Sequence, residues 1–295
     1  MYLRIDQIPV DFPTPKGPSP NGAAALQELL GGKFGEMSTL MNYTFQSFNF
    51  RGRAPARPYY DLIANIAAEE LSHIETVTYA INLLLTGSTL RGTDPTKHPL
   101  SKVEDARMSY HFLASGQAAL PVDSMGNYWT GQNVVSSGNL KFDLIHNFFL
   151  ECGARANKMR VYEMVDDPVA RAATGYLLVR GGTHIVAYAR ALEHLTGADL
   201  SKLFPIPDLS NDKFPEARKL EEKGYANIMF RFSPSDYGRL AEVWNGPHPE
   251  NGQPLTVSDS LPQGYAPPEL PEEPQLTSPG IDPEFLAAAA KRILG

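Results

Sequence analysis

The chain has 295 residues, of which 42% are hydrophobic, so it is long enough to bury a sizeable core. A net charge of -7 and a pI near 5.5 exclude the basic surface of a nucleic-acid-binding protein, and a single cysteine excludes an internal disulfide framework. The N-terminal MYLRIDQIPVDFP lacks the apolar core of a signal peptide, and no apolar stretch approaches membrane-spanning length. We therefore expect a cytoplasmic protein with neither a nucleic-acid nor a membrane partner.

The N-terminal elements are predicted from prolines and then from helical periodicity. Residues 1–20 are rich in proline and are expected to be extended, with Asn21 as a cap for the helix that follows. A helical pattern covers residues 23–50 and contains Gly31 and Gly32. Each internal glycine costs about 1 kcal/mol relative to alanine, so we expect close packing to compensate there.

Three more long elements follow, and their connections indicate the topology. A second helix is predicted over 58–85, followed by a crossover of roughly 88–137 with a short helical pattern near 103–114. Helices over 140–165 and 168–196 are separated by a tight turn. Two long helices, a long connection and two more helices are typical of an all-α, ferritin-like four-helix bundle.

The C-terminal part of the chain differs in composition. Ten of the 25 prolines fall between Gly246 and Pro283, a density that excludes regular helix and central strand there. This proline-rich tail is expected either to be disordered or to wrap over another surface, and to end in a short helix over 283–294. The predicted division is an extended segment (1–20), the bundle (21–200), and a C-terminal extension with its tail (201–295).

Ligand-type residues interrupt the apolar faces of the predicted helices. In the second helix Glu70 and His73 fall within an apolar row, at the Glu-x-x-His spacing that places a carboxylate and an imidazole on one metal. One such match is weak evidence. However, Glu36, Glu151 and His184 occupy the apolar faces of the other three helices near mid-length. This coincidence predicts a metal site between the four helices.

Other polar residues receive ordinary structural interpretations. Glu69 adjoins Glu70 but points about 100° away around the helix, so we expect it at the surface or in contact with a ligand, not as a ligand itself. Cys152 is expected to be a small buried hydrophobic residue. The spacing alone does not distinguish manganese from iron, because imidazole and carboxylate suit both.

At these residues the sequence resembles a known family. Long stretches around every candidate ligand are similar to the manganese catalases, the non-haem dimanganese branch of the ferritin-like superfamily. The likeness extends from LRID near the N-terminus to RFSPSDY and fades in the proline-rich tail. The stretches that carry it are GGKFGEMSTLMNYTFQSFNFRG (31–52), PYYDLIANIAAEELSHIE (58–75), SGNLKFDLIHNFFLE (137–151) and GYLLVRGGTHIVAYARALE (175–193).

The resemblance implies a complete ligand set. The implied manganese ligands are Glu36, Glu70, His73, Glu151 and His184. Glu70 and His73 are expected on one manganese, and Glu151 and His184 on the other. Glu36 matches a bridging carboxylate, and Tyr43 matches a tyrosine that donates a hydrogen bond to it.

One position departs from the symmetrical pattern of four-helix carboxylate proteins. Gly181 stands three residues before His184, where a second Glu-x-x-His would have glutamate. We expect Lys158 to supply a polar, catalytic group near the resulting space, although a surface lysine is an equal alternative. Arg155, one turn after Glu151, is expected to offset that carboxylate's charge as a second catalytic candidate.

The resemblance also implies chemistry, assembly and a further ion. The implied activity is disproportionation of hydrogen peroxide to water and dioxygen at two manganese ions per subunit, which cycle between Mn(II)2 and Mn(III)2. The family forms homohexamers with tails wrapped over neighbouring subunits. Some members bind calcium between subunits through an acidic residue that matches Asp61, but Asn65 stands where a second acidic ligand is wanted.

Three alternatives stay open on the sequence. The first is a ferritin-like iron store, although the long crossover and tail do not fit a shell-forming subunit. The second is a di-iron oxygenase or a radical-generating subunit, which would use the second Glu-x-x-His that Gly181 breaks. The third is a thiol peroxidase that uses Cys152.

Overall fold

The computed structural model describes residues 4–87, 118–203, 208–270 and 283–294. Within these ranges the chain is mostly helical, with one small sheet. The helices are α1 (Pro20–Gly31), α2 (Glu36–Phe48), α3 (Arg57–Thr86), α5 (Leu140–Met164), α6 (Pro168–Thr196), α7 (Pro215–Glu221) and α8 (Pro283–Leu294), with three short 3-10 turns, Gly131–Asn133, Ser201–Leu203 and Leu240–Glu242. The strands are β1 (Ile228–Phe230) and β2 (Thr256–Ser258).

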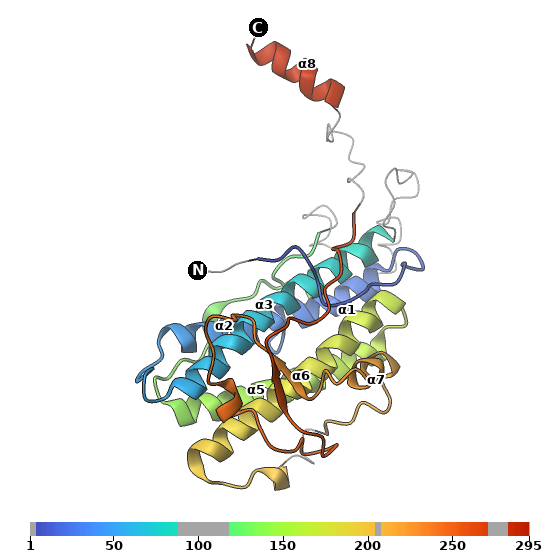
Figure 1. The fold of residues 1–295 in the computed structure, drawn as a ribbon. Coiled ribbons are helices and arrows are strands. Elements are labelled where there is room, and N and C mark those ends of the chain that lie inside the picture. The colour runs from blue at the N-terminus through green and yellow to red at the C-terminus, as the bar shows by residue number, and fades with distance from the viewer. Residues whose placement is uncertain (1–3, 88–117, 204–207, 271–282, 295) are drawn as a thin grey trace.

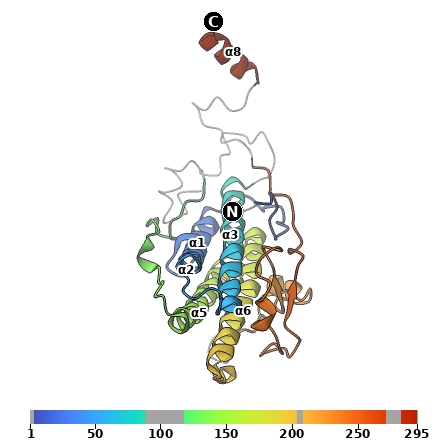
Figure 2. The same ribbon diagram turned by 60° about the vertical axis from the view of Figure 1, so that its left-hand side comes forward.

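Four helical rods form the centre of the molecule (Figure 1). Helices α3, α5 and α6 are three of them, and α1 with α2 makes the fourth, as the turned view also shows (Figure 2). The predicted ferritin-like four-helix bundle is therefore confirmed, as is the final short helix. The helices α3, α5 and α6 begin and end within a residue or two of their predicted bounds.

Local signals explain why these helices begin and end where they do. Asn139 and Asp167 precede α5 and α6, and their side chains accept hydrogen bonds from the backbone N–H groups of Phe142 and Val169. Helix α3 ends at Gly87, whose φ of 65° is in the left-handed region that glycine adopts without strain. The expected cap Asn21 instead lies inside α1, and Ser19 is the residue before that helix.

The prediction of one continuous helix over 23–50 is wrong. The chain leaves the helical conformation after Gly31 and resumes it at Glu36, because Gly32 and Gly35 both have extended backbone. Gly31 itself is required by a close approach: a Cβ there would lie 2.4 Å from the carbonyl oxygen of Val122. The break puts Glu36 in the first turn of α2, where a carboxylate is favoured by the helix dipole.

The second half of the crossover runs back along α1 and α2. The Gln27 amide donates to the carbonyl oxygens of Leu120 and Val122, and the Trp129 indole donates to Ser38 Oγ at 3.0 Å. These bonds fix residues 118–139 on one side of the bundle. The predicted short helix over 103–114 lies outside the described residues.

The C-terminal extension packs on the bundle and shares its core. Leu240, Val243 and Trp244 are buried in the same apolar cluster as Leu62 of α3 and Ala187 of α6. The parallel pair of β1 and β2 begins in register at Ile228 and Thr256, and α7 lies against α6. Residues 208–270 therefore cover two bundle helices of their own chain.

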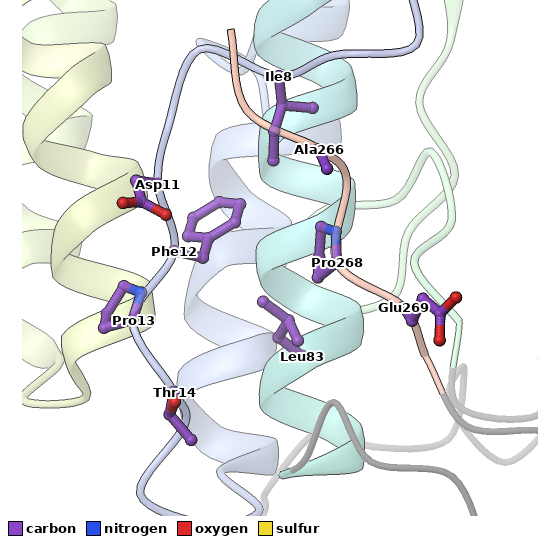
Figure 3. A pocket seen from close by; sticks show the side chains of 9 residues that line it. All are labelled: Ile8, Asp11, Phe12, Pro13, Thr14, Leu83, Ala266, Pro268 and Glu269. Carbon is purple, nitrogen blue, oxygen red and sulfur yellow. The ribbon is translucent and has the colours of Figure 1, made fainter.

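The beginning of the proline-rich tail runs beside the N-terminal segment. Ile8 and Tyr265 exchange backbone hydrogen bonds, and the two segments border a pocket over α3 (Figure 3). None of the residues that line this pocket is a predicted site residue; they are Ile8, Asp11, Phe12, Pro13, Thr14, Leu83, Ala266, Pro268 and Glu269. Helix α8 stands apart from the bundle (Figures 1 and 2). Among the described helices, none is both long and apolar enough to cross a bilayer.

Candidate metal centre

The middle of the bundle contains a cluster of charged side chains instead of apolar ones. Each rod contributes to it, and all the expected ligands are at most 1% exposed. They are Glu36 of α2, Glu70 and His73 of α3, Glu151 of α5 and His184 of α6. The structure thus brings together in one place the five residues that the sequence proposed as ligands.

Glu70 occupies the centre of this cluster. It belongs to two groups whose ligand atoms all lie within 4.8 Å of one another: one with Glu36 and His73, the other with Glu151 and His184. Its Oε1 lies 2.8 Å from His184 Nδ1, and its Oε2 accepts a hydrogen bond from Thr39 Oγ1 at 2.8 Å. The carboxylate common to both groups is therefore Glu70, whereas Glu36, the expected bridge, belongs to one of them.

Tyr43 contacts a different carboxylate from the one expected. Its hydroxyl donates a hydrogen bond to Glu151 Oε1 at 2.6 Å, and not to Glu36 as expected. The other oxygen, Glu151 Oε2, has no hydrogen-bond partner among the described residues. Tyr188 packs against the Tyr43 ring with centroids 5.2 Å apart, so two buried phenols close this side of the cluster.

The two histidines present the same ring nitrogen to the cluster. His73 Nδ1 lies 3.2 Å from Glu70 Oε2, and His184 Nδ1 lies 3.4 Å from Glu151 Oε1. The rings are stacked, with centroids 5.6 Å apart and an interplanar angle of 22°. Their Nε2 atoms instead face Glu69, at 3.7 Å for His73 and 3.1 Å for His184.

Lys158 lies beside the glycine that breaks the symmetrical pattern. Its Nζ is 3.0 Å from Glu36 Oε1, and the side chain is 1% exposed. A Cβ added at Gly181 would lie 3.2 Å from the same Nζ. Burial lowers the pKa of Lys158, but Glu36 and the neighbouring carboxylates raise it above its usual value. The lysine therefore lines the space that a longer side chain at position 181 would enter.

Arg155 is directed away from the position expected for it. Its guanidinium donates to the carbonyl oxygens of Asp208, Ser210 and Leu178 and to the side chain of Asn211. These contacts attach the C-terminal extension to α5 and α6. The described contacts thus give Arg155 a structural role, and its role in offsetting the Glu151 charge finds no support among them.

The residues of the cluster fit a cation. Buried oxygen and nitrogen atoms aimed into it have no hydrogen-bond partner within the described structure: Glu36 Oε1 and Oε2, Glu70 Oε1, Glu151 Oε2 and His184 Nδ1. Burial raises the pKa of Glu36, although Lys158 opposes that change. Burial lowers the pKa of His73, but the carboxylates of Glu70, Glu36 and Glu69 outweigh the effect of burial and raise this pKa to about 10. The carboxylates around this imidazole therefore favour positive charge within the cluster.

Fold and site together define a class: a ferritin-like bundle with a buried cluster of carboxylates and histidines that could hold metal ions. Comparison with known proteins narrows the class. The profile of the family described as manganese containing catalase matches residues 1–293. The chain belongs to the manganese catalase family.

Individual relatives agree with this assignment. A manganese catalase of Bacillus subtilis is 32% identical over 224 residues, 74% of this chain and 77% of the relative. A manganese catalase of Lactiplantibacillus plantarum is 28% identical over 247 residues, 83% of this chain and 87% of that protein. The crystal structure of KatB, a manganese catalase from Anabaena, superposes with a TM-score of 0.56 at 25% identity and covers 66% of this chain and 81% of that one.

Sequence reasoning underestimated two residues of the site. Glu69 is 0% exposed and binds Arg180 through both carboxylate oxygens, so it is no surface residue. Arg180 did not appear among the candidates at all. Arg180 lies three residues after Leu177 and four before His184, so it falls on the same apolar face of α6. That spacing was the sequence signal that could have identified Arg180 as a buried residue near the site.

Proposed function

We propose that this catalase disproportionates hydrogen peroxide to water and dioxygen at two manganese ions held by the five buried ligands. The chain's membership in the manganese catalase family gives the reaction and the metal. The observation that supports two ions per chain is Glu70, whose carboxylate is common to two separate groups of ligand atoms. The proposed ligands are Glu36, Glu70, His73, Glu151 and His184.

The charges of the cluster favour bound cations. Four buried carboxylates, those of Glu36, Glu69, Glu70 and Glu151, meet two fixed cations, Lys158 and Arg180. Unbalanced charge is expensive in a protein interior, so bound cations would stabilise this arrangement. When bound, the manganese pair supplies the two electrons that one peroxide accepts and a second peroxide returns.

The side chains around the ligands have two roles: one holds protons for the reaction, and another orients a ligand. Reduction of one peroxide to two water molecules takes up two protons, and oxidation of the next releases two. Lys158 Nζ forms an ion pair with Glu36 Oε1 at 3.0 Å and lies beside the open space at Gly181, which makes it our candidate for a catalytic proton-holding group. Tyr43 orients Glu151 through its 2.6 Å hydrogen bond.

The thiol alternative is not favoured by the structure. Burial raises the pKa of Cys152 to about 12, and Glu151 adds to the rise, so the thiol stays protonated at neutral pH. A thiol peroxidase needs a thiolate nucleophile. Cys152 is only partly buried, and it packs against the apolar cluster instead of lying inside it as expected.

Assembly into a homohexamer is part of this proposal and is supported by an exposed apolar surface. Phe142, Ile145 and Phe149 of α5 are 56%, 46% and 60% exposed, and their spacing places them on one side of the helix. Phe48 of α2 is 62% exposed. Exposed apolar groups of this kind mark protein contacts. Light scattering that gives the mass of six chains would support the hexamer, and a stable monomer would contradict it.

Calcium binding at Asp61 receives less support. Its Oδ1 accepts from Arg57 and its Oδ2 accepts from the backbone N–H of Arg239. Both side-chain atoms of Asn65 are engaged by the backbone of Phe230 and Phe232. A calcium ion would have to displace these bonds, so we expect no loss of activity when a calcium-selective chelator is added.

The experiment that tests the proposal measures oxygen release and metal content on one sample. The chain is produced in manganese-supplemented cells, purified and mixed with hydrogen peroxide. We expect about two manganese per chain, azide-sensitive oxygen release and no haem absorption. Bound iron without oxygen release would overturn the proposal, and iron loading far above two per chain would favour a storage protein.

A further inference from the structure

Glu69 lies immediately behind the metal cluster and contacts both histidines. It is next to Glu70 on α3, and its carboxylate contacts Arg180 and His184 of α6. Its Oε2 lies 3.1 Å from His184 Nε2, and its Oε1 lies 3.7 Å from His73 Nε2. One carboxylate therefore spans two imidazoles that come from different helices.

Arg180 fixes this carboxylate from the opposite side. Its Nε and Nη2 donate to the two oxygens of Glu69, the paired geometry that a guanidinium makes with a carboxylate. Its Nη1 donates to the carbonyl oxygens of Tyr225 and Ile228, the latter at 2.8 Å. Glu69, Arg180 and the backbone at Tyr225 and at Ile228, the first residue of β1, thus form one connected set of hydrogen bonds behind the cluster.

We propose that Glu69 is a positioning residue, which sets the orientation and the tautomer of both histidine ligands, and that Arg180 and the carbonyl groups of residues 225–228 hold it in place. A carboxylate that accepts from Nε2–H leaves the Nδ1 lone pair free for a metal ion. Both Nδ1 atoms face the cluster and both Nε2 atoms face Glu69. This inference depends on the ligand set proposed above.

A carboxylate suits this position better than a neutral side chain. His184 Nε2 lies within hydrogen-bonding distance of Glu69 Oε2, and His73 Nε2, which has no hydrogen-bond partner among the described residues, lies 3.7 Å from Oε1. The residue between the two imidazoles is therefore placed to accept from both. A glutamine offers one acceptor oxygen, and its NH2 group would oppose the second N–H donor. A single substitution at Glu69 is therefore expected to loosen one ligand on each metal.

The test compares manganese affinity in the full-length chain and its variants by competition with a chelator. We expect Glu69→Gln to weaken manganese binding by roughly 10–100-fold, the usual effect of losing a partner of a metal ligand. The electron paramagnetic resonance spectrum of the bound manganese should change as well. Arg180→Gln should act in the same direction with a smaller effect, and the double variant should be no weaker than Glu69→Gln.

A control separates positioning from general stability. Asp167 caps α6, the helix that carries Arg180 and His184, by accepting from the backbone N–H of Val169, and it touches no ligand. Asp167→Ala should lower the melting temperature and leave manganese affinity and spectrum unchanged. If Glu69→Gln behaves like this control, Glu69 is merely structural and the proposal is overturned.

Two further outcomes keep the test decisive. If Glu69→Gln does not fold, manganese affinity is measured in Arg180→Lys instead. This variant keeps the positive charge and loses the paired geometry with Glu69, so we expect manganese binding to weaken by about threefold to tenfold. Unchanged manganese binding in Arg180→Lys would overturn the proposal. An unmodified chain that binds no manganese would overturn the metal centre and this inference together. Normal binding by the unmodified chain and by Glu69→Gln would overturn this inference alone.

Discussion

The two halves of α3 bury different kinds of side chain. Up to His73 the helix buries Asp61, Glu69 and Glu70 beside other charged groups, at exposures of 0–1%. From Val77 onward its buried face is apolar and fully enclosed, with Ile81 and Leu84 both 0% exposed. Buried charge costs free energy, and apolar burial stabilises the fold. The first half also buries Leu62 and Ile66 in an apolar cluster, so both halves stabilise the bundle, and the first half in addition carries the charged groups arranged for chemistry.

Among the substitutions that test this difference between the two halves, Glu70→Gln is expected to have the largest effect. The change keeps the volume of the side chain and removes the carboxylate that both groups of ligands have in common. We expect a loss of bound manganese and of oxygen release larger than the roughly 10–100-fold effect of outer partners. The melting temperature of the metal-free chain should fall little, because one buried charge has been removed. Full manganese content in this variant would contradict the assignment of the shared carboxylate.

Lys158→Met tests a residue that is charged and buried but is not an expected ligand. The variant leaves the five ligands intact and removes the only amino group bonded to Glu36 among the described contacts. If Lys158 holds a proton for the reaction, oxygen release should fall by about 10² or more. Manganese content, measured on the same sample, should stay close to that of the unmodified chain. Unchanged turnover would show that a group other than Lys158 holds the proton for the reaction.

Leu84→Ala probes the apolar half alone. Leu84 is 0% exposed and packs in the apolar cluster with Leu26 and Leu29 of α1. Its truncation should lower the free energy of unfolding by about 2–5 kcal/mol. Leu84→Met, which conserves volume, should cost less than about 1.5 kcal/mol. Chemical denaturation checks both values. Oxygen release per bound manganese should be unchanged, and a large fall would show that the two halves are coupled.

Tyr43→Phe removes one hydrogen bond at the metal centre. The phenol donates to Glu151 Oε1, so its loss leaves that ligand less firmly oriented. We expect manganese affinity to fall about tenfold, at the lower end of the effects of outer partners. Chelator competition measures it. A variant whose affinity equals that of the unmodified chain would show that packing alone orients Glu151.

Cys152→Ala is expected to have the smallest effect. Its thiol is protonated at neutral pH, since burial raises its pKa to about 12. Peroxide consumption without added reductant should therefore persist in the variant. Loss of that activity, with manganese still bound, would return the thiol mechanism to consideration.

Much of the bundle was predictable because its signals are local. Helices α3, α5 and α6 follow from apolar periodicity and from caps such as Asn139 and Asp167. The break after Gly31 was missed, and the contact that requires this glycine is with the backbone of Val122, about ninety positions further along the chain. The packing of the C-terminal extension, anchored by the buried Trp244, rests on equally distant contacts.

The candidate site was predictable in its members but not in their roles. Spacing on helix faces selected Glu36, Glu70 and Glu151, yet only the positions of their oxygen atoms show that Glu70 lies between two groups. Likewise, periodicity placed Glu69 off the row of ligands, which is correct, but its burial depends on Arg180 of another helix. Contacts between helices decide such roles, and a single helix does not encode them.

The central claim is the location of two metal ions, and anomalous X-ray diffraction at the manganese edge tests it most directly. Crystals of the manganese-loaded chain should show two anomalous peaks. One should lie among Glu36, Glu70 and His73, the other among Glu70, Glu151 and His184. A single peak, or peaks outside these groups, would contradict the account of the site.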